Sequence, residues 1–423
     1  MRKMKDSGVE WIGKIPEDWE VSKNKYIFNR KKELVGHDWD KTQLLSLTTK
    51  GIVKKDINNL EGKLPDSFST YQIIKTKDLV LCLFDLDISA VFNGLSDFDG
   101  MISPAYKRYG LNVEGDIRYF NYFFDFIFEG RKYKNYSTTL RFTLDNSEFD
   151  RIKTIIPNVK EQKRIADFLD GMIGQISYVS SRIIQEIQTL ETYKKSVITE
   201  AVTKGLDKNA EMKDSGIEWI GEIPKHWKLK RIRNITIKSE RGTSPTYTTD
   251  ETLSKVVNQA TFSSGYFDKS NIRFSSIPAK ESKGLLEKGD VLIASTGGGI
   301  LGKTHYFMED EEYVADGHVT VMRTNPSIQN SKLLFYIFSI NYDLINGVLA
   351  KGSTNQTELQ SVWLNNFKIP CPDVTEQEEI VSYLDKKTQA IDEVIAIKQN
   401  QLSLLDEYKK SLIYEYVTGK REV

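Results

Sequence analysis

The chain of 423 residues carries the same motifs twice, and this repeat limits what it can fold into. The sequence MKDSGVEWIGKIPEDW begins at Met4, and MKDSGIEWIGEIPKHW begins at Met212. A second pair follows in the same order, with EQKRIADFLD from Glu161 and EQEEIVSYLD from Glu376. Chance does not place such pairs in the same order, so we interpret the chain as a tandem duplication.

A third pair of motifs divides each half into the same parts. YKKSVITEAVTKG starts at Tyr193 and YKKSLIYEYVTGK at Tyr408, at one offset from the second pair. Each half thus has a Trp-containing lead segment, a mixed region and a long helix. The predicted parts are a lead segment at 1–19, a first mixed domain at 20–158, a central region at 159–227 with a helix over 161–204 and the repeated lead segment, a second mixed domain at 228–373, and a distal region at 374–423 with a helix over 376–418.

The two predicted helices carry an apolar seam that is typical of a coiled coil. Residues 161–204 contain no proline, and apolar residues recur there at spacings of four and three. The seam of the second helix is less regular. The predicted seam residues are Ile165, Leu169, Met172, Ile176, Val179, Ile183 and Leu190 in the first helix, and Ile380, Leu384, Ile391, Leu402, Leu405 and Leu412 in the second.

These patterns predict an α+β fold in which two mixed α/β domains are separated by a long antiparallel two-helix coiled coil. A pseudo-two-fold axis between the halves would make the helices antiparallel, because each helix leaves one mixed domain and ends where the next lead segment begins. The C-terminus then returns beside the N-terminus, so segment 1–19 packs near the C-terminal helix in a circular layout. The alternative is two unrelated domains joined by a helical linker.

Residues 297–304 read GGGILGKT, which fits the spacing of a phosphate-binding loop. Such a loop must open a helix, because the N-terminal N–H groups of that helix face the phosphates. Here HYFMEDEEYVADGHVTVMRT follows, which predicts a strand, a loop and a second strand. The first half lacks the pattern, since Asp85 aligns with Gly297 and Val91 with Lys303. We expect a glycine-rich loop between strands, and an NTP-binding protein is the enzyme-class alternative.

The composition does not indicate what kind of molecule the protein binds. The chain has 59 basic and 59 acidic residues, and a net charge near zero does not point to a polyanion, although a local basic face can still bind one. Cys82 and Cys371 form neither a disulfide framework nor a metal-ligand cluster, which fits a reducing cytosol. The N-terminus lacks a signal-peptide pattern and no run of about 18 apolar residues occurs, so we expect a cytoplasmic protein without a membrane span.

Over nearly the whole chain, these motifs together resemble the specificity (S) subunit of type I restriction–modification systems. The features that carry the resemblance are the duplicated lead segments, the two EQ helix starts that follow KTIIPNVK and FKIPCPDVT, and the YKKS segments. The resemblance implies that each mixed domain is a target recognition domain that reads one half of a bipartite double-stranded DNA target. It also implies that the helices set the spacer and dock two modification (methyltransferase) subunits. A coiled-coil scaffold that binds only proteins is the alternative.

The same resemblance implies that the chemistry belongs to partner subunits. With restriction (translocase and nuclease) subunits, the complex would act in phage defence as an ATP-dependent site-specific deoxyribonuclease and an adenine-specific DNA methyltransferase. We therefore expect no catalytic residue, metal or cofactor in this chain, and S-adenosylmethionine, ATP and Mg in the partners. The sequence agrees, because the string nearest to an amino-methyltransferase tetrapeptide, Asn325 to Ile328, lacks its second proline and its aromatic residue.

Two polar, basic segments, one before each helix, are candidates for DNA contact. Bases are read by Arg, Lys, Asn, Gln, Ser and Thr, and phosphates are bound by Lys, Arg and hydroxyl groups. In the family that the chain resembles, this segment lies near the DNA. The candidates are Lys134, Ser137, Thr138, Thr139 and Arg141 in the first half, and Lys351, Ser353, Thr354, Asn355 and Gln356 in the second. A solvated turn with a helix N-cap is the alternative. Weaker candidates are Lys50, Lys54, Lys55, Lys107, Arg108, Arg241, Thr243, Lys303, Thr304 and His305, for which surface charge is the competing interpretation.

Overall fold

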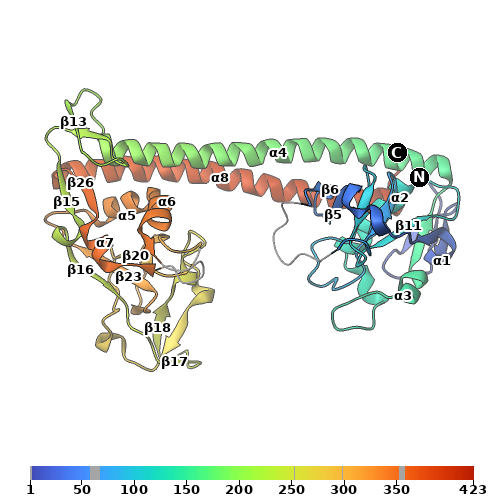
Figure 1. The fold of residues 1–423 in the computed structure, drawn as a ribbon, viewed down its shortest axis with the longest axis horizontal. Helices are drawn as coiled ribbons and strands as arrows, with labels where there is room; N and C mark the ends of the chain where they lie inside the picture. The colour runs from blue at the N-terminus through green and yellow to red at the C-terminus, as the bar shows by residue number, and fades with distance from the viewer. Residues whose placement is uncertain (1, 58–66, 252, 298, 352–357) are drawn as a thin grey trace. The chain divides into compact units, whose positions relative to one another are not determined.

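The computed structural model describes residues 2–57, 67–251, 253–297, 299–351 and 358–423 (Figure 1). It divides into two compact units: unit 1 is Met1–Ile184 with Gln399–Val423, and unit 2 is Gln185–Lys398. Each unit contains one mixed domain and about half of each long helix. The long helices are α4 (Val159–Lys204) and α8 (Val374–Val417), and each begins two residues before the start expected from the sequence.

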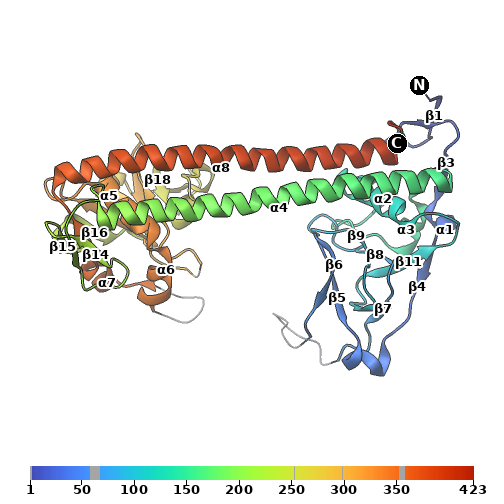
Figure 2. The ribbon, with the colours of Figure 1, turned by 90° about the horizontal axis from the view of Figure 1, so that it is seen from above.

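Two four-stranded sheets and one main helix form the mixed domain of unit 1. The sheet next to the helix has the order β4-β11-β8-β9, and the other has the order β6-β5-β10-β7. Their strands are β4 (Phe28–Lys31), β11 (Lys107–Leu111), β8 (Leu79–Leu81), β9 (Asn93–Leu95), β6 (Gly51–Lys55), β5 (Leu44–Thr48), β10 (Gly100–Ile102) and β7 (Gln72–Ile74). The main helix, α2 (Ile117–Glu129), lies beside the start of α4 (Figure 2). Five buried aromatic residues on α2 pack into the core of this unit: Tyr119, Phe120, Phe123, Phe124 and Phe126.

The mixed domain of unit 2 repeats the order of the first sheet and three strands of the second, in which one edge strand differs. Its sheets have the orders β16-β23-β20-β21 and β17-β19-β18-β22. Their strands are β16 (Thr236–Arg241), β23 (Val319–Thr324), β20 (Val291–Ala294), β21 (Thr304–Tyr306), β17 (Tyr247–Thr248), β19 (Arg273–Ser275), β18 (Ser254–Val257) and β22 (Tyr313–Ala315). The main helix is α5 (Ser331–Ile340). The parallel pairing of β5 with β10 recurs as β18 with β22, so the two mixed domains share their fold even though their sequences diverge.

Short hairpins and strand pairs connect the mixed domains to the long helices. In unit 1, β1 (Met4–Asp6) pairs with β2 (Lys14–Pro16), and β3 (Glu20–Lys23) pairs with β12 (Lys153–Ile156). In unit 2, β13 (Met212–Asp214) pairs with β14 (Glu222–Pro224), and β15 (Lys228–Arg231) pairs with β26 (Lys368–Cys371). The remaining short elements are α1 (Asn24–Ile27), α3 (Asn146–Arg151), α6 (Tyr342–Leu344), α7 (Ser361–Asn366), β24 (Ala350–Lys351) and β25 (Glu358–Leu359). The two cysteines, Cys82 and Cys371, are buried and free.

Within each unit, the segments of α4 and α8 run antiparallel. In unit 1, the ring of Phe168, near the start of α4, lies 4.5 Å from that of Tyr416, near the end of α8. In unit 2, Lys194 pairs with Asp392 over 2.6 Å, and Glu186 pairs with Lys398. A step toward the start of α4 is therefore a step toward the end of α8, as the sequence predicts.

Each long helix ends near a glycine, and the positions of the two glycines in the repeat differ by one residue. Gly205 follows α4 with φ +73°, and Gly419 follows α8 with φ +68°. A residue with positive φ after a helix stops it, and glycine adopts that conformation without a clash of a Cβ atom. The same positions also leave room for a buried tryptophan: a Cβ at Gly205 would lie 3.0 Å from the Trp227 ring, and one at Gly419 would lie 3.1 Å from the Trp19 ring.

Candidate nucleic-acid interface and its attachment to the helices

The repeated glutamate near the start of each long helix binds the tryptophan of the lead segment. Trp19 donates from Nε1 to Glu161 Oε2 over 2.9 Å, and Trp227 donates to Glu376 Oε2 over the same distance. Both tryptophans are buried, so the contact gives each buried indole N–H an acceptor. The tryptophan of the first motif and the glutamate of the second therefore recur together because they form one contact.

The repeated glutamine next to this glutamate holds the first turn of the main helix. Gln162 Oε1 accepts from the backbone N–H of Asp116 over 3.0 Å, and Gln377 Oε1 accepts from that of Asn330 over 2.7 Å. Asp116 and Asn330 are the N-cap residues of α2 and α5. Each glutamine is buried and also donates to the carbonyl of the proline that precedes its long helix. The glutamine thus fixes the domain against the helix within its unit.

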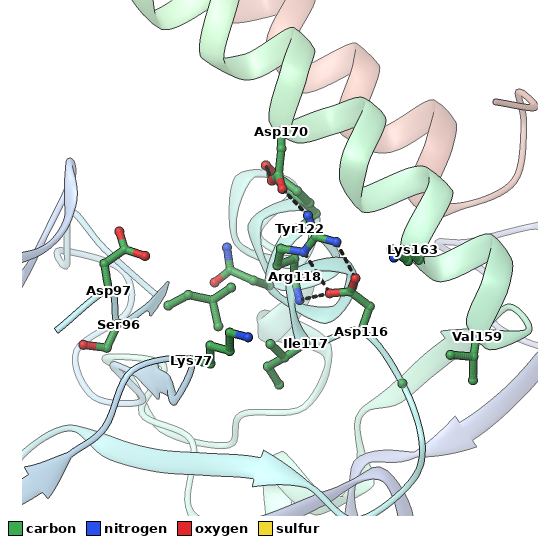
Figure 3. Close-up of a pocket in the computed structure, with 13 residues that line it drawn as sticks. Lys77, Ser96, Asp97, Asp116, Ile117, Arg118, Tyr122, Val159, Lys163 and Asp170 are labelled. Carbon is green, nitrogen blue, oxygen red and sulfur yellow. Dashed lines mark hydrogen bonds and ion pairs between the residues drawn. The ribbon is translucent and has the colours of Figure 1, made fainter. Parts of the chain in front are cut away.

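The aspartate that ends the second repeated motif makes a further attachment. Tyr122 of α2 donates from its hydroxyl to Asp170 over 2.6 Å, and Tyr336 of α5 donates to Asp385 over 2.6 Å. Arg118 of α2 adds an ion pair to Asp170 at 2.5 Å (Figure 3). Each mixed domain is therefore bound to the first three turns of its own helix by the same set of side chains. The sequence shows these residues only as a repeat, because their partners lie in the divergent domains.

The hydroxyl groups of the first polar segment hold its own turn together. Thr138 donates from Oγ1 to Glu148 over 3.0 Å, and Glu148 is the third residue of a capping box at the start of α3. Ser137 donates to the carbonyl of Thr143 over 2.9 Å, and Thr139 accepts from the Thr143 N–H over 2.8 Å. This geometry favours the solvated-turn interpretation for the three hydroxyl groups.

The two cations of this segment differ in how firmly they are held. Lys134 pairs with Asp87 over 2.8 Å and lies 4.2 Å from the centre of the Phe142 ring. Arg141 is 76% exposed, and its contact with Asp85 is 3.6 Å long. An exposed guanidinium with a long, weak ion pair can exchange that partner for a phosphate at little cost. Arg141 is therefore the member of this segment that is best placed for DNA.

Most of the second polar segment lies outside the described residues. This holds for Ser353, Thr354, Asn355 and Gln356. The backbone of Lys351 belongs to β24, which pairs with Glu358 and Leu359 of β25.

In the first mixed domain, three weaker candidates share one hairpin. Lys54 and Lys55 lie on β6 and Lys50 lies in the turn before it, and all three side chains are exposed. The ammonium group of Lys54 lies 4.6 Å from the centre of the Phe98 ring. This hairpin presents the densest group of exposed lysines among the candidates.

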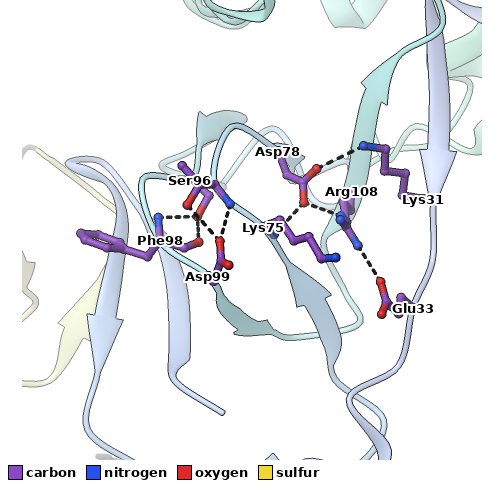
Figure 4. A network of polar contacts seen from close by, with 9 residues as sticks. Lys31, Glu33, Lys75, Asp78, Ser96, Phe98, Asp99 and Arg108 are labelled. Carbon is purple, nitrogen blue, oxygen red and sulfur yellow. Dashed lines mark hydrogen bonds and ion pairs between the residues drawn. The ribbon is translucent and has the colours of Figure 1, made fainter.

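Another candidate cation of this domain, Arg108, has a structural contact instead. It is buried on β11, and its Nε lies 2.5 Å from Asp78 Oδ2 (Figure 4). Lys31 and Glu33 complete the cluster at 3.5 Å and 3.4 Å from Asp78 and Arg108. A buried guanidinium bound to a buried carboxylate is not available to DNA, because breaking the pair would leave a buried charge without a partner. Its neighbour Lys107 is half-buried, and this burial lowers the pKa of its ammonium group.

The second domain has a similar pair of a half-buried arginine and a buried aspartate, which the sequence interpretation missed. Arg323 on β23 binds both oxygens of Asp290 at 2.8 Å. Asp78 and Asp290 also accept from equivalent backbone N–H groups, those of Lys75 and Glu287. The sequence does show that the two aspartates align, each just before an apolar strand. Their arginine partners stand at different distances along the chain, so the pairing could not be seen.

The glycine-rich loop joins two antiparallel strands, β20 and β21, as expected. Residue 298 lies outside the described residues, and the segment from 299 to the start of β21 contains no helix. Lys303 donates to the carbonyl of Ser263 over 2.5 Å, and Thr304 begins β21. The described part of the loop thus lacks the helix N-terminus on which phosphate binding depends.

The remaining candidates of the second domain are engaged within the protein. Arg241 donates to the carbonyl of Leu359 over 2.9 Å and pairs with Glu358. Thr243 shares a hydrogen bond of 2.8 Å with Ser282. The His305 ring lies against two phenylalanine rings, and burial lowers its pKa, so it is neutral near pH 7 and does not offer a phosphate a positive charge.

The helix seam follows the prediction at all of its positions except one. The other twelve predicted residues are buried or half-buried, but Val179 is 43% exposed. Between Ile176 and Ile183 the half-buried position is Ser180. Ile173, Ile176, Ser180, Ile183, Ile187 and Leu190 are buried or half-buried at alternating spacings of three and four, so Ser180 occupies the seam position and Val179 lies beside it. Val179 was therefore wrongly assigned to the seam.

Comparison with known proteins finds similarity to one family. Residues 224–407 match the model of the type I restriction modification DNA specificity domain. A protein of Methanocaldococcus jannaschii named "Putative type I restriction enzyme MjaX specificity subunit" is 23% identical over 97% of this chain and 96% of its own length. The chain is thus similar to type I restriction–modification specificity subunits, and a large part of its second half matches their DNA specificity domain. This similarity agrees with the resemblance that the duplicated motifs carry.

Two further matches agree with this family. The MjaVIII specificity subunit of the same organism is 24% identical over 66% of this chain and 64% of its own length. A chain in a solved structure described as "Structural basis underlying complex assembly and conformational transition of the type I R-M system" has the same fold, with a TM-score of 0.70, 17% identity, and coverage of 96% of this chain and 99% of that one.

No described helix is long and apolar enough to cross a membrane. Among the described side chains, no three of His, Cys, Asp or Glu gather closely enough to hold a metal ion.

Proposed function

We propose that this chain recognises DNA for a type I restriction–modification complex, with each mixed domain reading one half of a bipartite target. The observation that carries the proposal is the repeated fold: two domains whose sheets next to the main helix have equivalent strand orders are bound to equivalent helix starts, while their sequences diverge. Two domains with a common fold and different surface residues are suited to reading two different half-targets. The second domain lies almost wholly within the matched specificity domain.

Within this proposal, three exposed cations are the strongest candidates for DNA contact in the first domain. They are Arg141 and the hairpin residues Lys50 and Lys54. The segment with Ser353, Thr354, Asn355 and Gln356 is the corresponding candidate in the second domain. Phosphate contacts position a protein on DNA, and base contacts give it specificity. We assign Arg141 to base reading, because a guanidinium can bind a guanine edge through two hydrogen bonds.

We further infer that α4 and α8 pair along their whole length as an antiparallel coiled coil with pseudo-two-fold symmetry, and that they dock two methyltransferase subunits. Two apolar residues repeat at one offset and stay exposed in both copies. Val179 and Val394 are 43% and 41% exposed, and Tyr193 and Tyr408 are 53% and 46% exposed. Exposed apolar residues that a duplication keeps on both helices fit two copies of one protein partner.

In this scheme the chain supplies recognition and its partners supply the chemistry. S-adenosylmethionine, ATP and Mg would bind to the methyltransferase and restriction subunits. The complex would then act as an adenine-specific DNA methyltransferase and an ATP-dependent deoxyribonuclease, and the chain itself would have no catalytic residue.

Exchange of one domain tests the recognition proposal. Residues 228–373 are replaced by the same region of another specificity subunit, and the methylome of a host carrying the complex is sequenced. We expect one half-target to change and the other to stay. A host without the gene is the control, and it should lack the methylated site. A chimera that methylates the original bipartite site would refute the assignment of base reading to the mixed domains.

Truncation of the repeated tyrosines tests the docking proposal. Tyr193→Ala with Tyr408→Ala should weaken binding of the methyltransferase subunit by about 5- to 30-fold, which corresponds to about 1–2 kcal/mol for a tyrosine at the centre of an interface. The matched control is Tyr178→Ala, because Tyr178 is 68% exposed but has no counterpart in α8, where Glu393 stands at that position. Equal losses in the two variants would argue against a repeated docking site.

A further inference from the structure

A pocket of about 770 Å³ lies in unit 1, where the mixed domain meets the start of α4 (Figure 3). Its walls come from the loop before β8, the end of β9, the first turns of α2 and the first turns of α4. The residues on which the argument rests are Lys77, Leu95, Asn121 and Tyr122. Its size falls in the range of pockets that hold small ligands.

The repeat shows what stands at this place in unit 2. Leu79 pairs with Leu95 as Val291 pairs with Tyr306, so Leu95 and Tyr306 are equivalent. Asn121 and Phe335 stand the same number of residues after the N-caps of α2 and α5, which the repeated glutamines hold. The two residues are therefore equivalent. The second domain therefore has two aromatic rings where the first has a leucine and an asparagine.

These two rings pack against each other inside unit 2. Their centres are 6.1 Å apart, and the ammonium group of Lys332 lies 5.8 Å from the centre of the Tyr306 ring. The Tyr306 hydroxyl lies 3.4 Å from Ser331 Oγ. A phenol ring thus fills this place in the second copy, and the smaller side chains leave it open in the first.

Lys77 stands where the second copy has a glycine, Gly289. Both have a positive φ, 71° for Lys77 and 91° for Gly289, and both donate their backbone N–H to the strand opposite. Lysine is disfavoured in this conformation and glycine is not, so Lys77 is kept at a cost in stability. A Cβ at Gly289 would lie 3.8 Å from the Tyr306 hydroxyl oxygen. The side chain of Lys77 therefore starts next to the place where the oxygen of a bound phenol would lie.

The ammonium group of Lys77 is free to bind such an oxygen. The described residues offer it neither a hydrogen bond nor an ion pair. By contrast, Arg118 in the same pocket is held by Asp116 and Asp170. Residues kept in strained conformations beside a cavity are characteristic of binding sites.

We propose that this pocket binds the side chain of a tyrosine presented by another polypeptide, with the phenol oxygen facing Lys77. The ring takes the place that Tyr306 fills in the second copy, between Leu95 and Asn121. Of the two equivalent positions compared, only the one in unit 1 is open. A ligand bound there would give unit 1 a contact that the duplication did not preserve in unit 2. The inference does not depend on the proposed function.

Binding of two amides to the full chain tests this proposal. N-acetyl-tyrosinamide and N-acetyl-phenylalaninamide, which differ by the hydroxyl group, are titrated and followed by saturation-transfer NMR. We expect the tyrosine derivative to bind about three- to tenfold more tightly, which corresponds to the net gain of one hydrogen bond. Equal binding of the two, or no binding at about 10 mM, would overturn the proposal. Binding of p-cresol without binding of the tyrosine derivative would overturn it in favour of a free phenol.

Two variants separate the site from a structural role. Leu95→Tyr with Asn121→Phe gives the first copy the aromatic residues of the second, and it should abolish binding and raise Tm by filling the pocket. Binding that survives in a folded variant would place the amides elsewhere. Lys77→Gly should remove the preference for the hydroxyl group and leave Tm equal or higher, because it relieves the strained backbone. A lower Tm with the preference intact would show that Lys77 is structural.

Discussion

Lengthening of α4 should lengthen the gap between the two half-targets. The mixed domain of unit 1 is attached to α4 through Gln162 and Asp170, and Ser180 lies beyond both. Unit 2 holds α4 through Lys194 and the residues that follow it. Four residues inserted after Ser180 leave these attachments unchanged and add about 6 Å of helix. Base pairs stack at about 3.4 Å, so the unread spacer should grow by about one or two base pairs.

A second variant controls for damage to the helix pair. Because Phe168 lies against Tyr416 and the helices are antiparallel in unit 1, the position that faces Ser180 is close to Leu404. A matching insertion after Leu404 restores the pairing of the seams. Four residues make slightly more than one helical turn of about 3.6 residues, so each seam shifts without reversing. We expect the double insertion to give the same spacer change and a higher Tm than the single insertion.

The assay is methylome sequencing of cells that carry each insertion variant. Both half-targets should keep their sequences, because no residue of a mixed domain changes. An active variant with an unchanged spacer would refute the idea that the helices measure the gap. An active variant with altered half-targets would show that base reading lies in another part of the chain.

Three further predictions concern stability, the glycine-rich loop and the duplication. Burial raises the pKa of Asp125 to about 6, so its contribution to stability is complete below about pH 4 and is lost as the pH rises through 6. Asp125→Asn keeps the oxygen that accepts from Asn93 and should raise the free energy of unfolding by about 1–2 kcal/mol near pH 7.5 but not near pH 4, as measured by urea denaturation; an equal gain at both would contradict the assignment. Lys303→Ala should leave ATP hydrolysis by a reconstituted complex intact at saturating target DNA, and a loss of hydrolysis with unchanged DNA binding would restore the nucleotide alternative. A fragment that ends at Asp214 exposes the seam of α4, so it should form a homodimer in analytical ultracentrifugation and, with methyltransferase subunits, methylate a palindromic site; a soluble monomer at high concentration would count against the proposed symmetry.

The sequence by itself determined the frame of this protein. Motifs repeated in one order revealed the duplication, and proline-free stretches with an apolar seam located α4 and α8 to within two residues at each start. These features are local or recur along the chain, so periodicity and self-comparison suffice to find them. The strand after the glycine-rich loop was predictable for the same reason, since alternation of apolar residues is a local signal.

Only the tertiary structure decided what the repeated polar residues do and which candidate cations are free. Arg108 and Arg141 are both arginines near apolar runs, yet one is bound to a buried aspartate from another strand and the other is exposed. The equivalence of Leu95 with Tyr306, and with it the pocket beside Lys77, follows from strand register in domains whose sequences no longer align. Burial and pairing depend on residues that are distant in sequence, and one chain without its fold gives no measure of those distances.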